Sequence, residues 1–228
     1  MAKDFIQRIV RENSLLTSWV EEFNFRPARY VHPSFWKRWG GEAAVHEALQ
    51  TRRGAAGLSR LVLREAQAEG DFFLDFESEP LRLALLPGEA LGRLIRLAGL
   101  AANSHAIRQA IRKDDVALMR RQLGEDDYSF GVKVAPFLGN RGDLDFSRDE
   151  SDGKDMAVRV RRSGRRCVEA AGSGAPPALT KRWNLRFAPD ERLDFSPRWT
   201  ADQKEQAWRL LKRILLRYME PEWAACFS

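Results

Sequence analysis

The chain has 228 residues, of which 44% are hydrophobic and 31% charged, and this ordinary composition excludes a fibrous or intrinsically disordered protein. The longest apolar run, near 97–102, is far shorter than the roughly 20 residues that cross a bilayer, so we expect no membrane insertion. The net charge is +6, and 30 of the 38 basic residues are arginines spread along the chain. A nucleic-acid binder would gather them beside aromatic residues, so a basic helical nucleic-acid-binding protein is kept only as the alternative function.

The N-terminal pattern and the cysteine content favour a cytoplasmic protein. The first residues alternate charged and apolar side chains, and we expect no export signal because such signals need a continuous apolar stretch. The only cysteines are Cys167 and Cys226. So few cysteines favour reduced thiols in a cytosolic protein over a disulfide framework.

Residues 3–25 carry two apolar stripes at helical spacing, and Pro27 and Pro33 then prevent one continuous helix. Four aromatic residues crowd the next stretch: Tyr30, Phe35, Trp36 and Trp39. We interpret them as capping the core of the helical block at 83–138; the alternative is an aromatic docking patch for another protein. Residues 42–67 predict two further helices, and 70–80 favour a short strand or an extended connection.

The stretch 83–138 is the predicted core of the domain, built from several short helices. Apolar residues recur in it at helical spacing: Leu91, Leu94, Ile95 and Ala98, then Ile107, Ala110 and Ile111, then Val116, Met119 and Leu123. Arg93 and Arg96 fall on the opposite face of the first helix. Gly124 is placed where a helix would end.

Residues 128–135 fit two patterns. Alternation of apolar residues suits a strand, whereas Phe130, Val134 and Phe137 share one helical face. We predict a helix, because three acidic residues at 125–127 complement the positive end of a helix dipole.

Residues 140–178 change in character. An acidic stretch, 143–155, precedes five arginines in 159–166, and GSGAPP follows. With few bulky apolar residues to stabilise a packed arrangement, we expect a mobile charged insertion or linker. The alternative is a phosphate-binding arginine patch.

The C-terminal part, 179–228, regains regular structure. Alternating apolar residues on both sides of a turn at 188–191 predict a small β-hairpin near 183–195. A capping box, Thr200 with Gln203, then precedes an amphipathic helix whose apolar face carries Trp208, Leu211, Leu215 and Tyr218. The expected fold is therefore mainly α-helical, a single domain over 1–228.

Motifs of catalysis, metal binding and nucleotide binding are absent from the sequence. His32, His46 and His105 have no partner at metal-ligand spacing, and GSGAPP is not flanked as a dinucleotide loop would be. We therefore assign no catalytic, metal or cofactor-binding residues and expect no cofactor. A protein that works through its surfaces is the favoured interpretation.

Four motifs resemble the SctK family of type III secretion proteins, in the same order over residues 22–140. They read FRPARYVHPSF, RLALLPGEALGRLIRLAGL, AIRQAIRKDDVALMRRQLG and FGVKVAPFLG. The resemblance implies a non-enzymatic cytosolic adaptor of the sorting platform, at the cytosolic face of the injectisome. Its implied partners are the pod protein (SctQ-like) and the cytosolic domain of the inner-membrane ring protein (SctD-like), with SctL and the ATPase reached indirectly.

The candidate partner-binding residues come from charge alone. Arginine pairs bidentately with carboxylates, so exposed arginines of the central block and the basic face of the last helix could dock acidic surfaces. They are Arg93, Arg96, Arg108, Arg112, Arg120, Arg209, Lys212 and Arg213. The alternative is that these side chains only form a solvated face.

Overall fold

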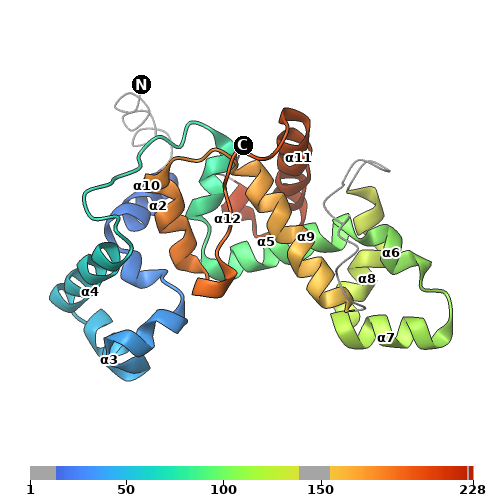
Figure 1. Ribbon diagram of the computed structural model, residues 1–228, viewed down its shortest axis with the longest axis horizontal. Coiled ribbons are helices and arrows are strands. Elements are labelled where there is room, and N and C mark those ends of the chain that lie inside the picture. The colour runs from blue at the N-terminus through green and yellow to red at the C-terminus, as the bar shows by residue number, and fades with distance from the viewer. Residues whose placement is uncertain (1–13, 139–154, 225, 228) are drawn as a thin grey trace. The chain divides into compact units, whose positions relative to one another are not determined.

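The computed structural model describes residues 14–138, 155–224 and 226–227 (Figure 1). All the regular elements in these ranges are helices and none is a β-strand, which confirms the expected mainly α-helical fold. The chain groups into two compact units: unit 1 is the chain up to Gly88 with Gly174–Asp194, and unit 2 is Glu89–Ser173 with the chain from Phe195 onward. The expected single domain stays a prediction.

Unit 1 combines α-helices with short 3-10 helices. They are α2 (Ser14–Phe25), η1 (Pro27–Arg29), η2 (Pro33–Trp39), α3 (Gly41–Leu49), α4 (Arg52–Glu65), η3 (Glu79–Leu85), α10 (Pro177–Trp183), η6 (Asn184–Arg186) and η7 (Pro189–Glu191). Pro27 and Pro33 begin η1 and η2, where the missing N–H has no helical partner to lose. Thr51 caps α4 by accepting a hydrogen bond from the Gly54 N–H at 3.0 Å.

The aromatic residues that follow α2 belong to the core of unit 1. Phe35 is buried with Val31, Val62 and Leu185, and further side chains pack against this cluster: Tyr30, Trp36, Trp39 and Ala66. The Phe35 and Trp39 rings stack with centroids 6.2 Å apart. The aromatic group therefore packs in a core, as expected, but this core belongs to unit 1 and contains no residue of the central block 83–138.

Unit 2 is built around α5 (Gly88–Ala102), which begins at the boundary between the units. Its other elements are α6 (Ser104–Gln109), α7 (Lys113–Leu123), α8 (Glu125–Lys133), η4 (Ala135–Phe137), α9 (Met156–Ala171), α11 (Ala201–Tyr218) and α12 (Pro221–Ala224). The predicted stripe of α5 is buried, while Arg93 and Arg96 are exposed. Gly124 ends α7 with φ at +84°, a conformation that glycine adopts without strain.

Two predictions for the short helices of unit 2 have different outcomes. Residues 128–133 lie in α8, so helix rather than strand is confirmed there, with all three acidic residues in its first turn. The stripe of Ile107, Ala110 and Ile111 is only partly right. Ile107 is fully buried, but α6 ends at Gln109 and Ile111 is 85% exposed.

The expectation of a mobile insertion over 140–178 is wrong for residues 156–171. These form α9, which Asp155 caps by accepting a hydrogen bond from the Ala157 N–H at 2.9 Å. Small residues explain the error: Ser163 and Gly164 continue the buried face between Val160 and Cys167, so that face has few bulky apolar side chains. Residues 139–154, which hold most of the acidic stretch, lie outside the described residues.

The predicted β-hairpin near 183–195 is also wrong. The segment forms the end of α10, then η6 and η7. One side chain takes over the role of a strand partner: the Asn184 amide accepts from the Leu193 N–H at 2.8 Å and donates to the Leu193 carbonyl at 3.0 Å. Leu193 and Phe195 are buried without a β-ladder.

The last long helix follows its sequence pattern. The capping box at the start of α11 is present, with Thr200 and Gln203 each bonding the other's backbone N–H. Leu211 and Leu215 are fully buried, and α11 packs along α9. The amphipathic helix predicted for this stretch is therefore confirmed.

The backbones of α5 and α9 touch where they cross. A Cβ atom added to Gly99 of α5 would lie 1.8 Å from the Val160 carbonyl oxygen, and one added to Gly164 of α9 would lie 1.8 Å from the Ile95 carbonyl oxygen. Real Cβ atoms do not approach backbone so closely, so each helix needs glycine at this point. The crossing fixes the position of α9 within unit 2.

We predict that Gly99→Ala and Gly164→Ala each lower the free energy of unfolding by about 1–3 kcal/mol, because the added methyl group forces the two helices apart. Gly92→Ala on the exposed face of α5 is the control, since its Cβ would enter open space. Alanine there should raise the stability by up to about 1 kcal/mol. Urea denaturation followed by circular dichroism measures all three, and equal stability of the Gly99 and Gly92 variants would exclude the close crossing.

Candidate partner-binding surfaces

Three candidate arginines of the central block pair with carboxylates inside unit 2. Arg93 meets Glu220 at 2.6 Å, Arg96 meets Asp127 at 3.4 Å, and Arg120 meets Glu125 at 3.4 Å. Burial raises the pKa of Asp127, and the Arg96 charge opposes that rise. Arg93, Arg96 and Arg120 therefore already have an acidic partner within the chain.

The basic face of α11 also makes internal contacts. Arg209 pairs with Glu205 one turn earlier, and the Arg213 guanidinium donates to the Leu138 carbonyl. The Lys212 ammonium lies 6.0 Å from the centroid of the Trp208 ring, at the outer limit of a cation–π contact. The structure thus places these three side chains along their own helix and beside η4.

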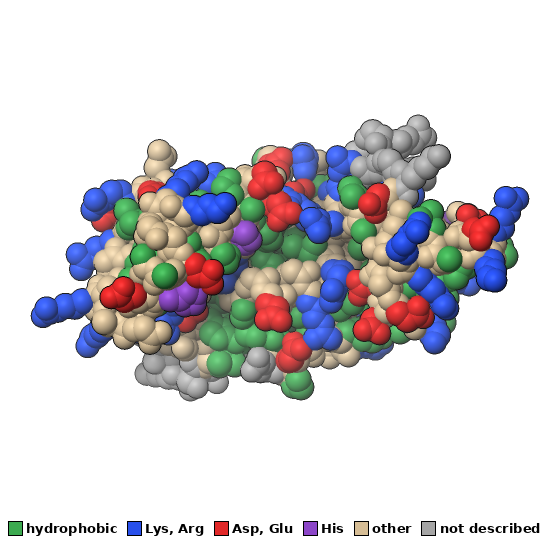
Figure 2. Space-filling model, turned by 90° about the horizontal axis from the view of Figure 1, so that it is seen from below, with side chains coloured by type: hydrophobic (Ala, Val, Ile, Leu, Met, Phe, Trp, Pro, Cys, Tyr) green, Lys and Arg blue, Asp and Glu red, His purple; other side chains and the backbone are tan. Residues whose placement is uncertain are grey.

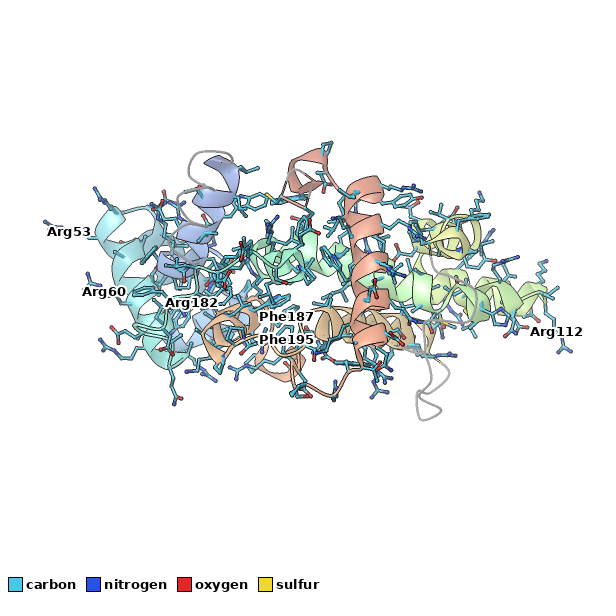
Figure 3. The ribbon with its side chains drawn as sticks, turned by 90° about the horizontal axis from the view of Figure 1, so that it is seen from above. Arg53, Arg60, Arg112, Arg182, Phe187 and Phe195 are labelled. Carbon is cyan, nitrogen blue, oxygen red and sulfur yellow. The ribbon has the colours of Figure 1, made fainter. Side chains whose placement is uncertain are left out.

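The side chains of the remaining candidates, Arg108 and Arg112, have no hydrogen-bond or ion-pair partner among the described residues, and both residues are exposed. They flank Ile111 at the connection from α6 to α7, and Lys113 follows, so we call these four residues the basic tip. Figure 3 shows the Arg112 side chain pointing away from the helices. The structure therefore brings together two of the eight candidate residues, around one exposed isoleucine.

A second arginine-rich feature of unit 2 lies between α9 and the start of α11. It is a hollow of about 590 Å³ lined by Arg162, Arg165, Arg166, Glu169, Arg198, Trp199 and Gln203. Glu169, with its side chain 9% exposed, pairs with Arg198 at 2.9 Å. Arg166 and Arg198 lie 5.5 and 5.2 Å from the Trp199 ring centroid. The arginine run of 159–166 thus contributes side chains to a folded hollow.

Charges of both signs are interspersed on the face of the molecule that Figure 2 draws. On the face drawn in Figure 2, Lys and Arg side chains alternate with Asp and Glu side chains. A continuous basic stripe, which is the electrostatic footprint of a nucleic-acid binder, is not visible on that face. The basic tip gathers arginines over only a few residues, which is much less than a continuous stripe.

Unit 1 contains the extended segment 67–77 that follows α4 (the teal loop in Figure 1). An extended connection is one of the two predictions for 70–80, but the side chains that hold it were not predicted. Three elements hold its backbone through side chains. From α2, the Asn24 amide donates to the Phe73 carbonyl at 2.7 Å and accepts from the Phe73 N–H at 2.9 Å. From η3, Arg82 donates to the Phe76 carbonyl at 2.8 Å.

The third set of bonds comes from α10. Arg182 is fully buried and donates to the carbonyls of Ala68, at 2.9 Å, and of Asp71, while Lys181 donates to the Gln67 carbonyl at 2.7 Å. Figure 3 shows Arg182 within the body of unit 1. Burial lowers the pKa of Arg182. The fixed position of segment 67–77 thus depends on polar side chains that are distant in sequence.

Sites of other kinds are not found in the described part of the chain. No three His, Cys, Asp or Glu side chains within 14–138, 155–224 and 226–227 gather so that they could hold a metal ion. Nor is any helix in these ranges both long enough and apolar enough to cross a membrane.

Comparison with protein families identifies the family of the chain that carries these surfaces. The model of the family described as YOP proteins translocation protein K (YscK) matches residues 15–227. The chain belongs to the YscK family. YscK is the SctK family of type III secretion, so the resemblance seen in four motifs is confirmed and extends over both units. This YscK family member is accordingly a type III secretion protein. No curated protein and no solved structure matches the chain.

We predict that Arg182→Met destabilises the protein by at least about 2 kcal/mol, because it leaves buried carbonyl oxygens without a donor. Amide hydrogen exchange should rise within residues 67–77 and stay unchanged in α9. Arg60→Met is the matched control, since Arg60 is exposed on α4 (Figure 3). Unchanged exchange in segment 67–77 of the Arg182 variant would show that Arg182 does not hold it.

Proposed function

We propose that this YscK family member is a non-enzymatic adaptor at the cytosolic face of the secretion apparatus. It links the cytosolic domain of the inner-membrane ring protein (SctD-like) to the pod protein (SctQ-like), and reaches SctL and the ATPase only through the pod. The family match over residues 15–227 carries the proposal, because it covers nearly the whole chain and both units. The work of the protein is then contact between surfaces, without conversion of a substrate.

The basic tip is the part of the proposed adaptor best suited to an acidic partner. Arg108 and Arg112 are exposed and unpaired among the described residues, so their guanidinium groups can bind carboxylates without first breaking an internal ion pair. Ile111 between them is 85% exposed and offers apolar area to bury. A cluster of this kind, an apolar centre with charges around it, is typical of protein interfaces.

The other candidate residues suit this role less. Each of Arg93, Arg96, Arg120 and Arg209 would have to leave a carboxylate inside the chain before it could pair with a partner. Exposed ion pairs contribute little to stability. Exchanging an internal carboxylate for a partner's carboxylate is therefore feasible, but it adds little binding free energy. We therefore assign docking of an acidic surface to Arg108, Arg112 and Ile111.

The adaptor function predicts that the chain co-elutes in size-exclusion chromatography with the matching pod protein and with the cytosolic domain of the ring protein. Arg108→Glu combined with Arg112→Glu should weaken one of these complexes about tenfold or more, because like charges then face each other. The effect should shrink as salt rises. If the chain forms a complex with neither the pod protein nor the ring domain, the adaptor function is excluded.

Arg53→Glu combined with Arg60→Glu is the matched control for the charge change. Both arginines are exposed on α4 and point away from it in Figure 3, so the variant carries the same change of net charge in unit 1. It should bind within about twofold of the wild type. Equal weakening by the two variants would mean that net charge and not the basic tip determines affinity. Tight binding of an arbitrary duplex at physiological salt would instead favour the nucleic-acid alternative.

A further inference from the structure

Two phenylalanines form a contiguous exposed patch on unit 1. Phe25, the last residue of α2, and Phe72, in segment 67–77, lie with ring centroids 5.2 Å apart, and each is 51% exposed. Single exposed apolar residues are common on protein surfaces, whereas contiguous patches often mark interaction sites. The pair is thus a candidate docking surface.

The same two segments also supply buried aromatic residues, so the exposed pair is not part of the core. Phe23 and Phe76 are fully buried and meet edge to face at 5.7 Å. Phe73 packs edge to face on Phe76 at 4.9 Å. The core of unit 1 is therefore filled by their neighbours, and the outer faces of Phe25 and Phe72 remain in water.

The surroundings of this pair are acidic. Residues 65–79 contain six acidic side chains and no Lys or Arg. Cations from elsewhere in unit 1 offset some of them: Arg64 meets Glu69 at 3.6 Å and Lys181 meets Asp71 at 3.3 Å. The Arg182 guanidinium lies 5.9 Å from the Phe72 ring, and Arg82 bonds the backbone of the segment. The segment itself thus carries only negative side chains, and these cations come from other elements.

Asp75 is the acidic residue most available to a partner. It is exposed, it has no ion pair among the described residues, and its carboxylate accepts only from the Glu77 backbone N–H, at 3.3 Å. We call Phe25, Phe72, Asp71 and Asp75 the acidic–aromatic surface. Its chemistry is an apolar patch with carboxylates beside it.

The backbone beneath this surface is fixed before any partner binds. Asn24 bonds both backbone groups of Phe73, next to Phe72, and Arg182 bonds the carbonyl of Asp71 on its other side. A partner therefore need not order the segment, and avoiding that loss of entropy favours tighter binding. An extended segment with no regular structure would otherwise be a poor docking surface.

We propose that the acidic–aromatic surface docks a Lys- or Arg-rich segment of a neighbouring component of the secretion apparatus, an inference that rests on the adaptor function proposed above. An apolar or cationic side chain of the partner would lie on the Phe25 and Phe72 rings. Its basic neighbours would pair with Asp75 and share Asp71 with Lys181. Since the basic tip of unit 2 suits an acidic partner, the two units present docking surfaces of opposite charge. An adaptor with two such surfaces can distinguish its two neighbours.

The test is a double variant, Phe72→Ser with Asp75→Asn, whose asparagine keeps an acceptor for the Glu77 N–H. Its affinity is measured separately for the pod protein and for the ring cytosolic domain. One Kd should rise about tenfold or more, since a central apolar anchor and a carboxylate are removed together. The Kd for the other partner should stay within about twofold. The affected complex should also weaken as salt rises.

The matched control is Leu61→Ser with Asp190→Asn, also in unit 1. Leu61 is 37% exposed on α4 and Asp190 is exposed in η7, so the control changes the same kinds of group away from the surface. It should bind both partners like the wild type. If wild type binds a partner and the Phe72/Asp75 variant binds both within twofold, the docking surface is wrong while the adaptor function stands. If the wild-type protein binds neither partner, both the docking surface and the adaptor function are wrong.

Discussion

Unit 1 depends on polar side chains that hydrogen-bond the backbone of extended segments. Buried N–H and carbonyl groups need partners, and the described residues of this unit contain no β-strand that could supply them. Asn24 and Asn184 each bond both backbone groups of one distant residue, Phe73 and Leu193. Two asparagines thus perform locally what a β-ladder performs along a whole strand.

Two buried arginines also hydrogen-bond backbone carbonyl groups of distant segments. Arg182 and Arg186 are one helical turn apart and almost completely buried; Arg186 donates to the Ala84 carbonyl at 3.0 Å and lies 4.2 Å from the Tyr30 ring centroid. Burial lowers the pKa of Arg186 to about 10, so the guanidinium is still charged at neutral pH. Its charge is stabilised by the Ala84 carbonyl, by the Tyr30 ring and, from farther away, by the Glu22 carboxylate.

Helices with strong periodicity could be predicted from the sequence, and helices packed through small residues could not. The stripe of α5 and the capping box of α11 follow local rules, and both are present. In α9 the buried face passes through Ser163 and Gly164, which resemble loop residues until a second helix is placed against them. The hairpin prediction failed because alternation at 183–195 cannot reveal that Asn184 bonds Leu193.

The candidate surfaces were predictable only in part, for a similar reason. Sequence identifies which arginines fall on an exposed face, but Arg93 is paired by Glu220, 127 residues away, and no local pattern indicates such a pair. Arg108 and Arg112 remain as candidates because nothing in the described chain folds over them. The signal for the acidic–aromatic surface was present as EGDFFLDFESE, although its rigidity comes from residues of α2 and α10.

The order in which the chain visits its two units has a consequence for biosynthesis. Unit 1 closes only when Gly174–Asp194 joins the first stretch, and unit 2 needs α11, which begins at Ala201. During translation, therefore, neither unit can complete its packing until most of the polypeptide has left the ribosome. Partly made chains would expose the apolar faces of α5 and α4, and exposed apolar surface of this kind promotes aggregation of incompletely folded chains.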